Sequence, residues 1–194
     1  TDTDVDSDTD SDTDTDVEPV LYLMHTERCW YCTAYEAHEI LLGPADSADP
    51  TDAALWDVIA TAEEMDITGA ASNTWFQGLT IDLPGIGSGD TFRLAFHYTG
   101  ENADKWYLED LCITTDPTSS ETVCLWEYGF DDCTSLGTLA GTGWSQVDGP
   151  DDDSSETWRT SYDTYVSYPT SATIDNDYYN LIDNYLVSEN ITIP

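Results

Sequence analysis

Hydrophobic and polar residues alternate along several stretches of this chain, which is the pattern of half-buried β-strands. In residues 91–98 three apolar side chains alternate with polar or small ones. Residues 75–83 precede them across the turn 84–90, which is rich in glycine, so the two segments predict a hairpin. Apolar runs predict further strands at 20–25, 106–114, 124–130 and 157–161. Residues 53–65 fit either a short helix or a strand.

The composition favours the same class of fold. Twelve tyrosines, seven tryptophans and many threonines suit the pleated surface of a sheet better than a helix. A chain of 194 residues is long enough for one domain with a real core. We therefore expect an all-β protein with a single β-sandwich.

The first 18 residues form an acidic leader of a different texture. Aspartate occupies every even position to residue 16, and threonine, serine or valine fills the odd ones: Asp2, Asp4, Asp6, Asp8, Asp10, Asp12, Asp14 and Asp16. As a strand, the leader would place all its carboxylates on one face, about 6.6 Å apart. Two interpretations stay open, a solvated linker and a ladder that binds calcium.

The charge balance narrows the range of partners. Forty acidic residues face four basic ones, for a formal net charge of -36. Nucleic acids and anionic membranes repel such a surface, so we expect cations or basic surfaces as partners. A salt-rich habitat or bound calcium would each screen the repulsion. No stretch approaches the roughly 20 apolar residues of a membrane helix.

Five cysteines point to an oxidising, extracellular location, with two disulfides and one cysteine left over. The pair Cys29 and Cys32 has the spacing of a dithiol redox site, but the chain lacks the alternating strand and helix pattern of such enzymes. A structural disulfide is the favoured reading there. Cys112, Cys124 and Cys133 flank the polar segment 115–123 and are candidates to join the two parts of the chain.

Two segments resemble the bacterial choice-of-anchor J domains and the related MAM domains, which are extracellular jelly-roll sandwiches. Residues 128–161, with YGFDDC, GTGW, VDGPDDD and ETWRTS, resemble the opening of such a domain. Residues 74–113, with TIDLPGIGSGDTFRLAFHY and KWYLEDLCI, resemble its ending. The resemblance implies a jelly roll with its halves in permuted order, residues 19–114 as the second half and 124–194 as the first.

Half a sandwich exposes unpaired strand edges and one apolar face, so the halves must close over each other. Within one chain, the linker 115–123 would make a circular permutant. Between chains, each subunit would complete the next head to tail and build a filament. The sequence leaves both arrangements open.

The resemblance also implies a structural calcium ion between the first and last strands of the domain. Its ligands would be Glu109, Asp110, Glu127, Asp131 and Asp132, because a hard cation takes six to eight oxygen ligands. A second candidate group lies in the acidic loop 148–156 and consists of Asp148, Asp151, Asp152 and Asp153. The alternative for both groups is a set of solvated surface acids.

We expect a secreted, non-enzymatic structural protein, a subunit of a filament or surface layer with calcium-stabilised joints between identical copies. One alternative is an adhesion module that binds glycans, if Trp106, Trp144 or Trp158 lies exposed. A secreted glycanase or dithiol oxidoreductase is a lesser alternative, because abundant acids make any carboxylate pair unspecific. His25, His38 and His97 lie far from one another in sequence and are expected to be packed or surface residues.

Overall fold

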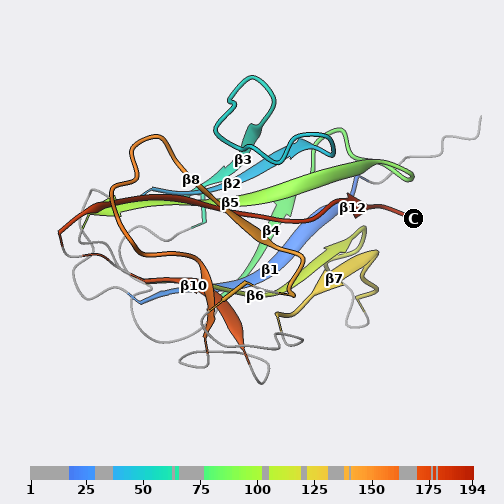
Figure 1. Ribbon diagram of the computed structural model, residues 1–194. Coiled ribbons are helices and arrows are strands. Elements are labelled where there is room, and N and C mark those ends of the chain that lie inside the picture. Colours follow the sequence, from blue (N-terminus) through green and yellow to red (C-terminus); the bar gives the residue numbers. More distant parts are fainter. Residues whose placement is uncertain are drawn as a thin grey trace, which may run out of the picture.

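The computed structural model describes residues 18–28, 37–62, 64–65, 77–101, 105–118, 122–130, 138–139, 141–161, 170–175, 177 and 179–194. These residues form an all-β protein, and Figure 1 shows its strands in two layers. The predicted class of fold is confirmed. Residues 1–17 of the acidic leader, together with Cys29, Cys32 and Cys133, lie outside the described residues.

The first sheet has six antiparallel strands. Its strands in spatial order are β4 (Gln77–Asp82), β1 (Val20–Arg28), β6 (Lys105–Thr114), β10 (Ser171–Ile174) and β9 (Arg159–Ser161), and β7 (Trp126–Tyr128) also pairs with β6. Both β7 and β10 lie along the same edge of β6, at different heights. Between them Asp110 has a left-handed backbone, with a φ of 48°, and the pairing of β1 with β6 shifts by one residue there.

The second sheet also has six antiparallel strands. Its order is β3 (Asp57–Thr61), β2 (Ala37–Pro44), β5 (Thr91–Glu101), β11 (Leu181–Val187) and β8 (Ser145–Asp148), and β12 (Ile191–Thr192) pairs with β5 below β11. The ambiguous segment 53–65 is therefore a loop that leads into the edge strand β3. A strand at 91–98 is confirmed and extends to residue 101. The predicted hairpin of residues 75–83 and 91–98 is wrong, because β4 pairs with β1 in the first sheet whereas β5 belongs to the second sheet.

Strands from both parts of the chain build both sheets. The sequence after the linker 115–123 supplies β7, β9 and β10 to the first sheet and β8, β11 and β12 to the second. The strand that follows Leu125 pairs with residues 111–113 of its own chain, and the Leu125 amide donates to the Ile113 carbonyl at 2.7 Å. The closure between the halves is thus made within one molecule.

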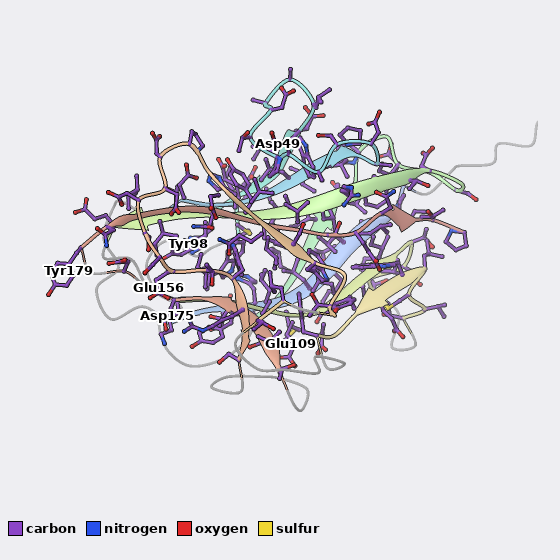
Figure 2. The ribbon with its side chains drawn as sticks, in the orientation of Figure 1. Asp49, Tyr98, Glu109, Glu156, Asp175 and Tyr179 are labelled. Carbon is purple, nitrogen blue, oxygen red and sulfur yellow. A yellow bond between two sulfur atoms is a disulfide. The ribbon has the colours of Figure 1, made fainter. Side chains whose placement is uncertain are left out.

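One main core fills the space between the sheets. Phe92, Leu94 and Phe96 point into it from β5, as their alternation predicts, and residues of β1, β6, β10 and β11 meet them. Because this single cluster draws side chains from both sides of the linker, neither part of the chain has a separate core among the described residues. Figure 2 shows Tyr98 among these side chains, between the two layers.

A smaller apolar cluster covers the outer face of the second sheet. The loop that follows β2 folds back and lays Trp56 over Leu41, Ala95 and Val187. A Cβ atom at Gly43 would overlap the Trp56 ring, so only glycine lets the indole approach the strand this closely. Part of the outer face of the second sheet is therefore shielded from solvent, and its polar residues lie beside this cluster.

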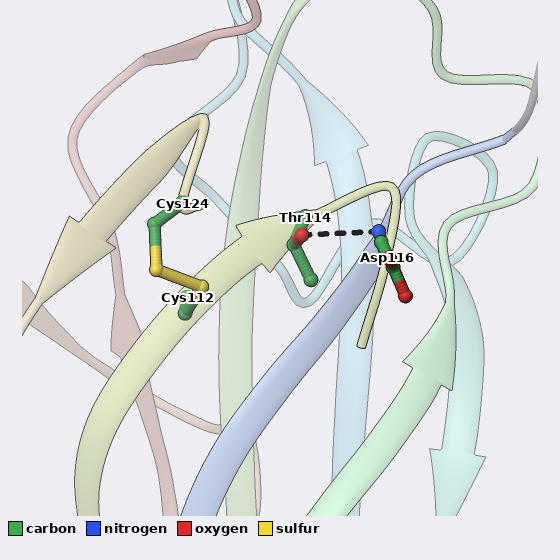
Figure 3. The surroundings of a disulfide bond; sticks show 4 residues. All are labelled: Cys112, Thr114, Asp116 and Cys124. Carbon is green, nitrogen blue, oxygen red and sulfur yellow. Dashed lines mark hydrogen bonds between the residues drawn. A yellow bond between two sulfur atoms is a disulfide. The ribbon is translucent and has the colours of Figure 1, made fainter. Parts of the chain in front are cut away.

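A disulfide joins Cys112 of β6 to Cys124, twelve residues later. Figure 3 shows it beside the start of the linker, where the Asp116 amide donates to Thr114 Oγ1 at 3.1 Å. The disulfide closes the loop that connects the two parts of the chain. It confirms the expectation that cysteines flanking the linker connect the two parts of the chain.

Replacing both Cys112 and Cys124 by alanine is expected to lower the free energy of unfolding by about 2–4 kcal/mol, because the unfolded chain regains the freedom of the closed loop. Urea denaturation under oxidising conditions measures this change. Val123→Ala is the matched control, since this exposed residue lies in the same loop and forms no disulfide. Equal midpoints for the double variant and the control would contradict the stabilising role.

Candidate functional site

A histidine bridges two carboxylates on the outer face of the second sheet. His97 Nδ1 lies 2.9 Å from Glu39 Oε2, and His97 Nε2 lies 2.8 Å from Asp183 Oδ1. The imidazole also stacks on Tyr185 with ring centroids 4.0 Å apart and an interplanar angle of 5°. The three strands β2, β5 and β11 are thereby linked side chain to side chain.

Strand alternation and register create this arrangement. Phe96 points inward, so the next residue, His97, points outward. The pairing of β5 places Glu39 of β2 on one side of His97 and Tyr185 of β11 on the other. Asp183 lies two positions along β11 from Tyr185, on the same face. Residues 58 and 86 positions away in sequence thus converge on one ring.

Both ring nitrogens of His97 face a carboxylate oxygen. A neutral imidazole has one donor nitrogen, and only the imidazolium donates from both nitrogens at once. The hydrogen bond from His97 lowers the pKa of Glu39, against an opposing effect of partial burial. Burial first, and then the charges of Asp183, Glu39 and Asp49, raise the pKa of Tyr185 to about 12. The phenol of Tyr185 therefore stays neutral at neutral pH.

The acidic loop after β8 is docked onto β11 beside this bridge. Asp152 Oδ1 accepts hydrogen bonds from the Asp183 amide at 3.0 Å and from Asn184 Nδ2 at 2.9 Å. In return, the Asp151 amide donates to Asp183 Oδ2 at 3.1 Å. Burial raises the pKa of Asp152, and backbone hydrogen bonds oppose this rise. These contacts hold the loop in one conformation.

Gly149 makes the close approach of the loop possible. A Cβ atom at this position would overlap the Asp183 carboxylate, and the Gly149 amide donates to the Asp183 carbonyl. Any larger residue would push the loop away from β11. The glycine of the VDGPDDD motif is thus required by packing.

The predicted calcium ligands are only partly brought together. Glu127 pairs in register with Cys112, three residues beyond Glu109, and Glu109 itself is fully buried. Asp131 and Asp132 lie outside the described residues. Asp148, Asp151 and Asp153 are exposed in the loop, where Asp153 Oδ1 accepts from the Leu181 amide. The described part of the chain contains no group of three or more His, Cys, Asp or Glu side chains arranged to hold a metal ion.

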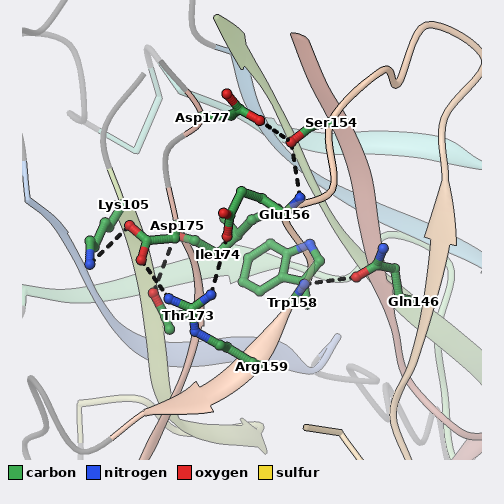
Figure 4. A network of polar contacts seen from close by, with 10 residues as sticks. All are labelled: Lys105, Gln146, Ser154, Glu156, Trp158, Arg159, Thr173, Ile174, Asp175 and Asp177. Atoms are coloured by element: carbon green, nitrogen blue, oxygen red, sulfur yellow. Dashed lines mark hydrogen bonds and ion pairs between the residues drawn. The ribbon is translucent and has the colours of Figure 1, made fainter. Parts of the chain in front are cut away.

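The basic side chains that the structure describes are engaged within the chain. Figure 4 shows Lys105 and Arg159 converging on Asp175, with Lys105 Nζ at 2.9 Å from Asp175 Oδ1. Arg159 Nη1 also contacts Glu156 at 3.2 Å. Arg93 donates to the Ser188 carbonyl at 2.7 Å and to the Ala45 carbonyl at 3.3 Å.

The interior of the sandwich contains several polar side chains at one level. His38 of β2 and Asn184 of β11 flank Tyr98 of β5 in register. Across the core, the Trp106 ring of β6 lies 4.8 Å from the His38 ring and 5.8 Å from the Trp158 ring. The pKa of His25 falls to about 4 and that of His38 to about 3, mainly because burial disfavours their charged forms.

Among the described residues, six buried side-chain atoms have no hydrogen-bond partner in the protein. Five belong to these interior side chains, namely His25 Nδ1, His38 Nε2, Trp106 Nε1, Trp158 Nε1 and Asn184 Oδ1, and the sixth is Tyr107 Oη. Each unpaired buried group costs about 1–3 kcal/mol. Five of them together would rival the whole free energy of folding, which is about 5–15 kcal/mol.

The structure decides two points about aromatic and histidine residues that the sequence left open. Trp106, Trp144 and Trp158 are 0%, 6% and 2% exposed, so they cannot form a platform for sugars on the surface. The sequence predicts that His97 is a packed or surface residue, and the structure places it on the outer face of the second sheet, where it contacts two carboxylates. The sequence signal was the outward position of His97 in the alternating strand, but its partners depend on strand order.

Comparison with family models, with curated proteins and with solved structures found no match to this chain. In the described residues there is no helix with the length and apolar character needed to cross a bilayer.

Replacing His97 by phenylalanine is expected to lower the free energy of unfolding by about 1.5–3 kcal/mol, because the charge-assisted hydrogen bonds to Glu39 and Asp183 are lost. Thermal and urea denaturation at neutral pH measure the change. Tyr185→Phe is the matched control, since it preserves the stacked ring and leaves the bridge intact. A His97→Phe variant as stable as this control would contradict the bridging role.

Acidification from pH 7.5 to 5.5 at constant ionic strength is expected to cost about 1 kcal/mol for each of His25 and His38. The unfolded chain protonates both near pH 6.5, whereas the folded pKa values are about 4 and about 3. The unfolded state therefore binds more protons in this window, so the free energy of unfolding decreases as the pH is lowered.

The slope of unfolding free energy against pH tests this cause. His38→Phe should reduce the slope between pH 6.5 and 5.5 by about half, because one of the two titrating groups is removed. Ile40→Val, a change of the same core without a titratable group, should leave the slope unchanged. An unchanged slope in His38→Phe would show that the buried histidines do not cause the acid sensitivity.

Proposed function

We propose that this protein is a non-catalytic structural component of an extracellular filament or surface layer, in which calcium ions bridge the acidic faces of identical copies. The main observation behind this proposal is that the described basic side chains bind oxygen atoms of their own chain. Arg93, Lys105 and Arg159, whose side chains the structure describes, all contact oxygen atoms of their own chain. They contribute little positive charge for a neighbouring copy.

Charge then decides how copies can meet. With a net charge of -36, two copies repel each other at short range unless cations lie between them. Calcium suits this role because it takes many carboxylate oxygens in flexible geometry. Asp148, Asp151 and Asp153 are exposed on a loop whose backbone is fixed by β11, so their carboxylates are available at a defined place.

Because the sandwich is closed, we propose that neighbouring copies contact each other through the outer faces of their sheets. Each copy fills its own strand positions, so a head-to-tail filament would not need to exchange strands. The disulfide between Cys112 and Cys124 supports an oxidising, extracellular location. The interleaving of strands from both sides of the linker is compatible with a jelly roll of permuted halves, which we propose as the origin of this topology.

An adhesion module is the second candidate function, and one exposed aromatic residue favours it. Tyr179 is 88% exposed, and its amide is held by Asp177 Oδ1 at 2.9 Å. Figure 2 shows Tyr179 at one tip of the molecule, where its side chain projects outward. An exposed ring on a backbone held in this way can stack on a sugar or on another protein.

Addition of calcium is expected to raise the stability by about 1–3 kcal/mol and to shift the protein from monomer to larger species. Thermal denaturation and analytical ultracentrifugation measure the two effects, with magnesium and with sodium chloride of equal ionic strength as comparisons. A chelator should reverse both effects. A monomer of 21.5 kDa with an unchanged melting temperature in calcium would contradict the proposal.

Paired variants locate the calcium response. Asp148→Asn, Asp151→Asn and Asp153→Asn combined should reduce it, because carboxylate ligands are replaced by neutral amides. The matched control combines Asp46→Asn, Asp49→Asn and Asp52→Asn, which removes the same charge from another exposed loop. Equal losses in both variants would mean that calcium acts as a diffuse screen and would contradict a defined joint.

A further inference from the structure

We infer that the interior of the sandwich holds a binding site for a neutral ligand that presents hydroxyl groups, formed by His25, His38, Trp106, Trp158 and Asn184. The ligand is ordered water or a sugar hydroxyl in its place. This site is independent of the proposed calcium joints, which lie on the surface.

The location of the site follows from register and ring contacts. His38 and Asn184 lie on either side of Tyr98 on the inner face of the second sheet. Trp106 faces His38 from the first sheet, and Trp158 packs against Trp106. His25 of β1 is close enough to His38 for their charges to affect each other. All five side chains are at least nine-tenths buried.

The unpaired atoms specify the chemistry of the ligand. Two are indole N–H groups, which only donate, and one is an amide oxygen, which only accepts. Each neutral imidazole offers either a donor or an acceptor, depending on its tautomer. The ligand must therefore both accept and donate hydrogen bonds, as a hydroxyl group or a water molecule does.

Charged ligands fit this site poorly. The indole N–H groups of Trp106 and Trp158 repel a cation placed against them. An anion would lack a positive partner there, because the imidazoles remain neutral near pH 7, and the chain as a whole is strongly acidic. Buried water molecules make about three hydrogen bonds each to otherwise unpaired groups, which this set of donors and acceptors can supply.

The indole resonances of the full-length, ¹⁵N-labelled protein test the site. Trp106→Phe and Trp158→Phe assign the two Nε1–H signals. Cross-relaxation between these protons and water is expected in the unliganded protein. The Trp56 signal is the internal control, because this buried indole donates to Ser47 Oγ at 3.4 Å and should show no such water contact.

Titration with neutral monosaccharides distinguishes the two sources of hydroxyl groups. If a sugar occupies the site, both signals shift and lose their water contact. If water is the ligand, both signals keep their water contact throughout. Zinc chloride and glucuronate should change neither signal. Shifts caused by zinc or glucuronate in place of a sugar would overturn the neutral class of ligand, and the absence of both water contact and sugar shifts would overturn the site.

His38→Phe provides a second measurement, because it keeps a flat ring and removes two nitrogen atoms. The water contact at Trp106 should fall about twofold or more, since a bound water loses one of about three partners. Ile40→Val, which alters the same core without changing a polar group, should leave this contact unchanged. An unchanged contact in His38→Phe would exclude the imidazole from the site.

Discussion

Burial of one apolar core by strands from both parts of the chain is the constraint on which the structure depends. β5 and β6 lie at the centres of the two sheets, and the later strands β10 and β11 cover their open edges. Removing either part would leave a row of unpaired backbone groups and an apolar face in water. The linker 115–123 therefore joins two parts of one folding unit, and the disulfide keeps its ends together.

The charged side chains of this sandwich act mainly on its surface. Acidic side chains are used locally: Glu39 and Asp183 hold His97, Asp152 holds the backbone of β11, and Asp175 gathers Lys105 and Arg159. Each contact turns a potential source of repulsion into a link between strands. Many of the other acids that the structure describes face solvent, and their repulsion makes the protein sensitive to the cations around it.

The interior combines this apolar core with a cluster of polar groups at one level. Such groups are expensive when unpaired, and they are fully compatible with folding once water or a hydroxyl ligand completes their hydrogen bonds. The depressed pKa values of His25 and His38 have the same origin, because the environment that disfavours their charge also strengthens hydrogen bonds to their neutral rings. Acid sensitivity and ligand binding are thus linked through burial.

The sequence by itself determined the class of fold, the main strands and their inward faces, because alternation is a local property of neighbouring residues. It also indicated that cysteines flanking the linker join the two parts. Only the tertiary structure decided that the halves pair within one chain, that His97 meets Glu39 and Asp183, and that the conspicuous tryptophans Trp106, Trp144 and Trp158 are buried. These features depend on strand order and register, which bring together residues far apart in sequence and which no local pattern encodes.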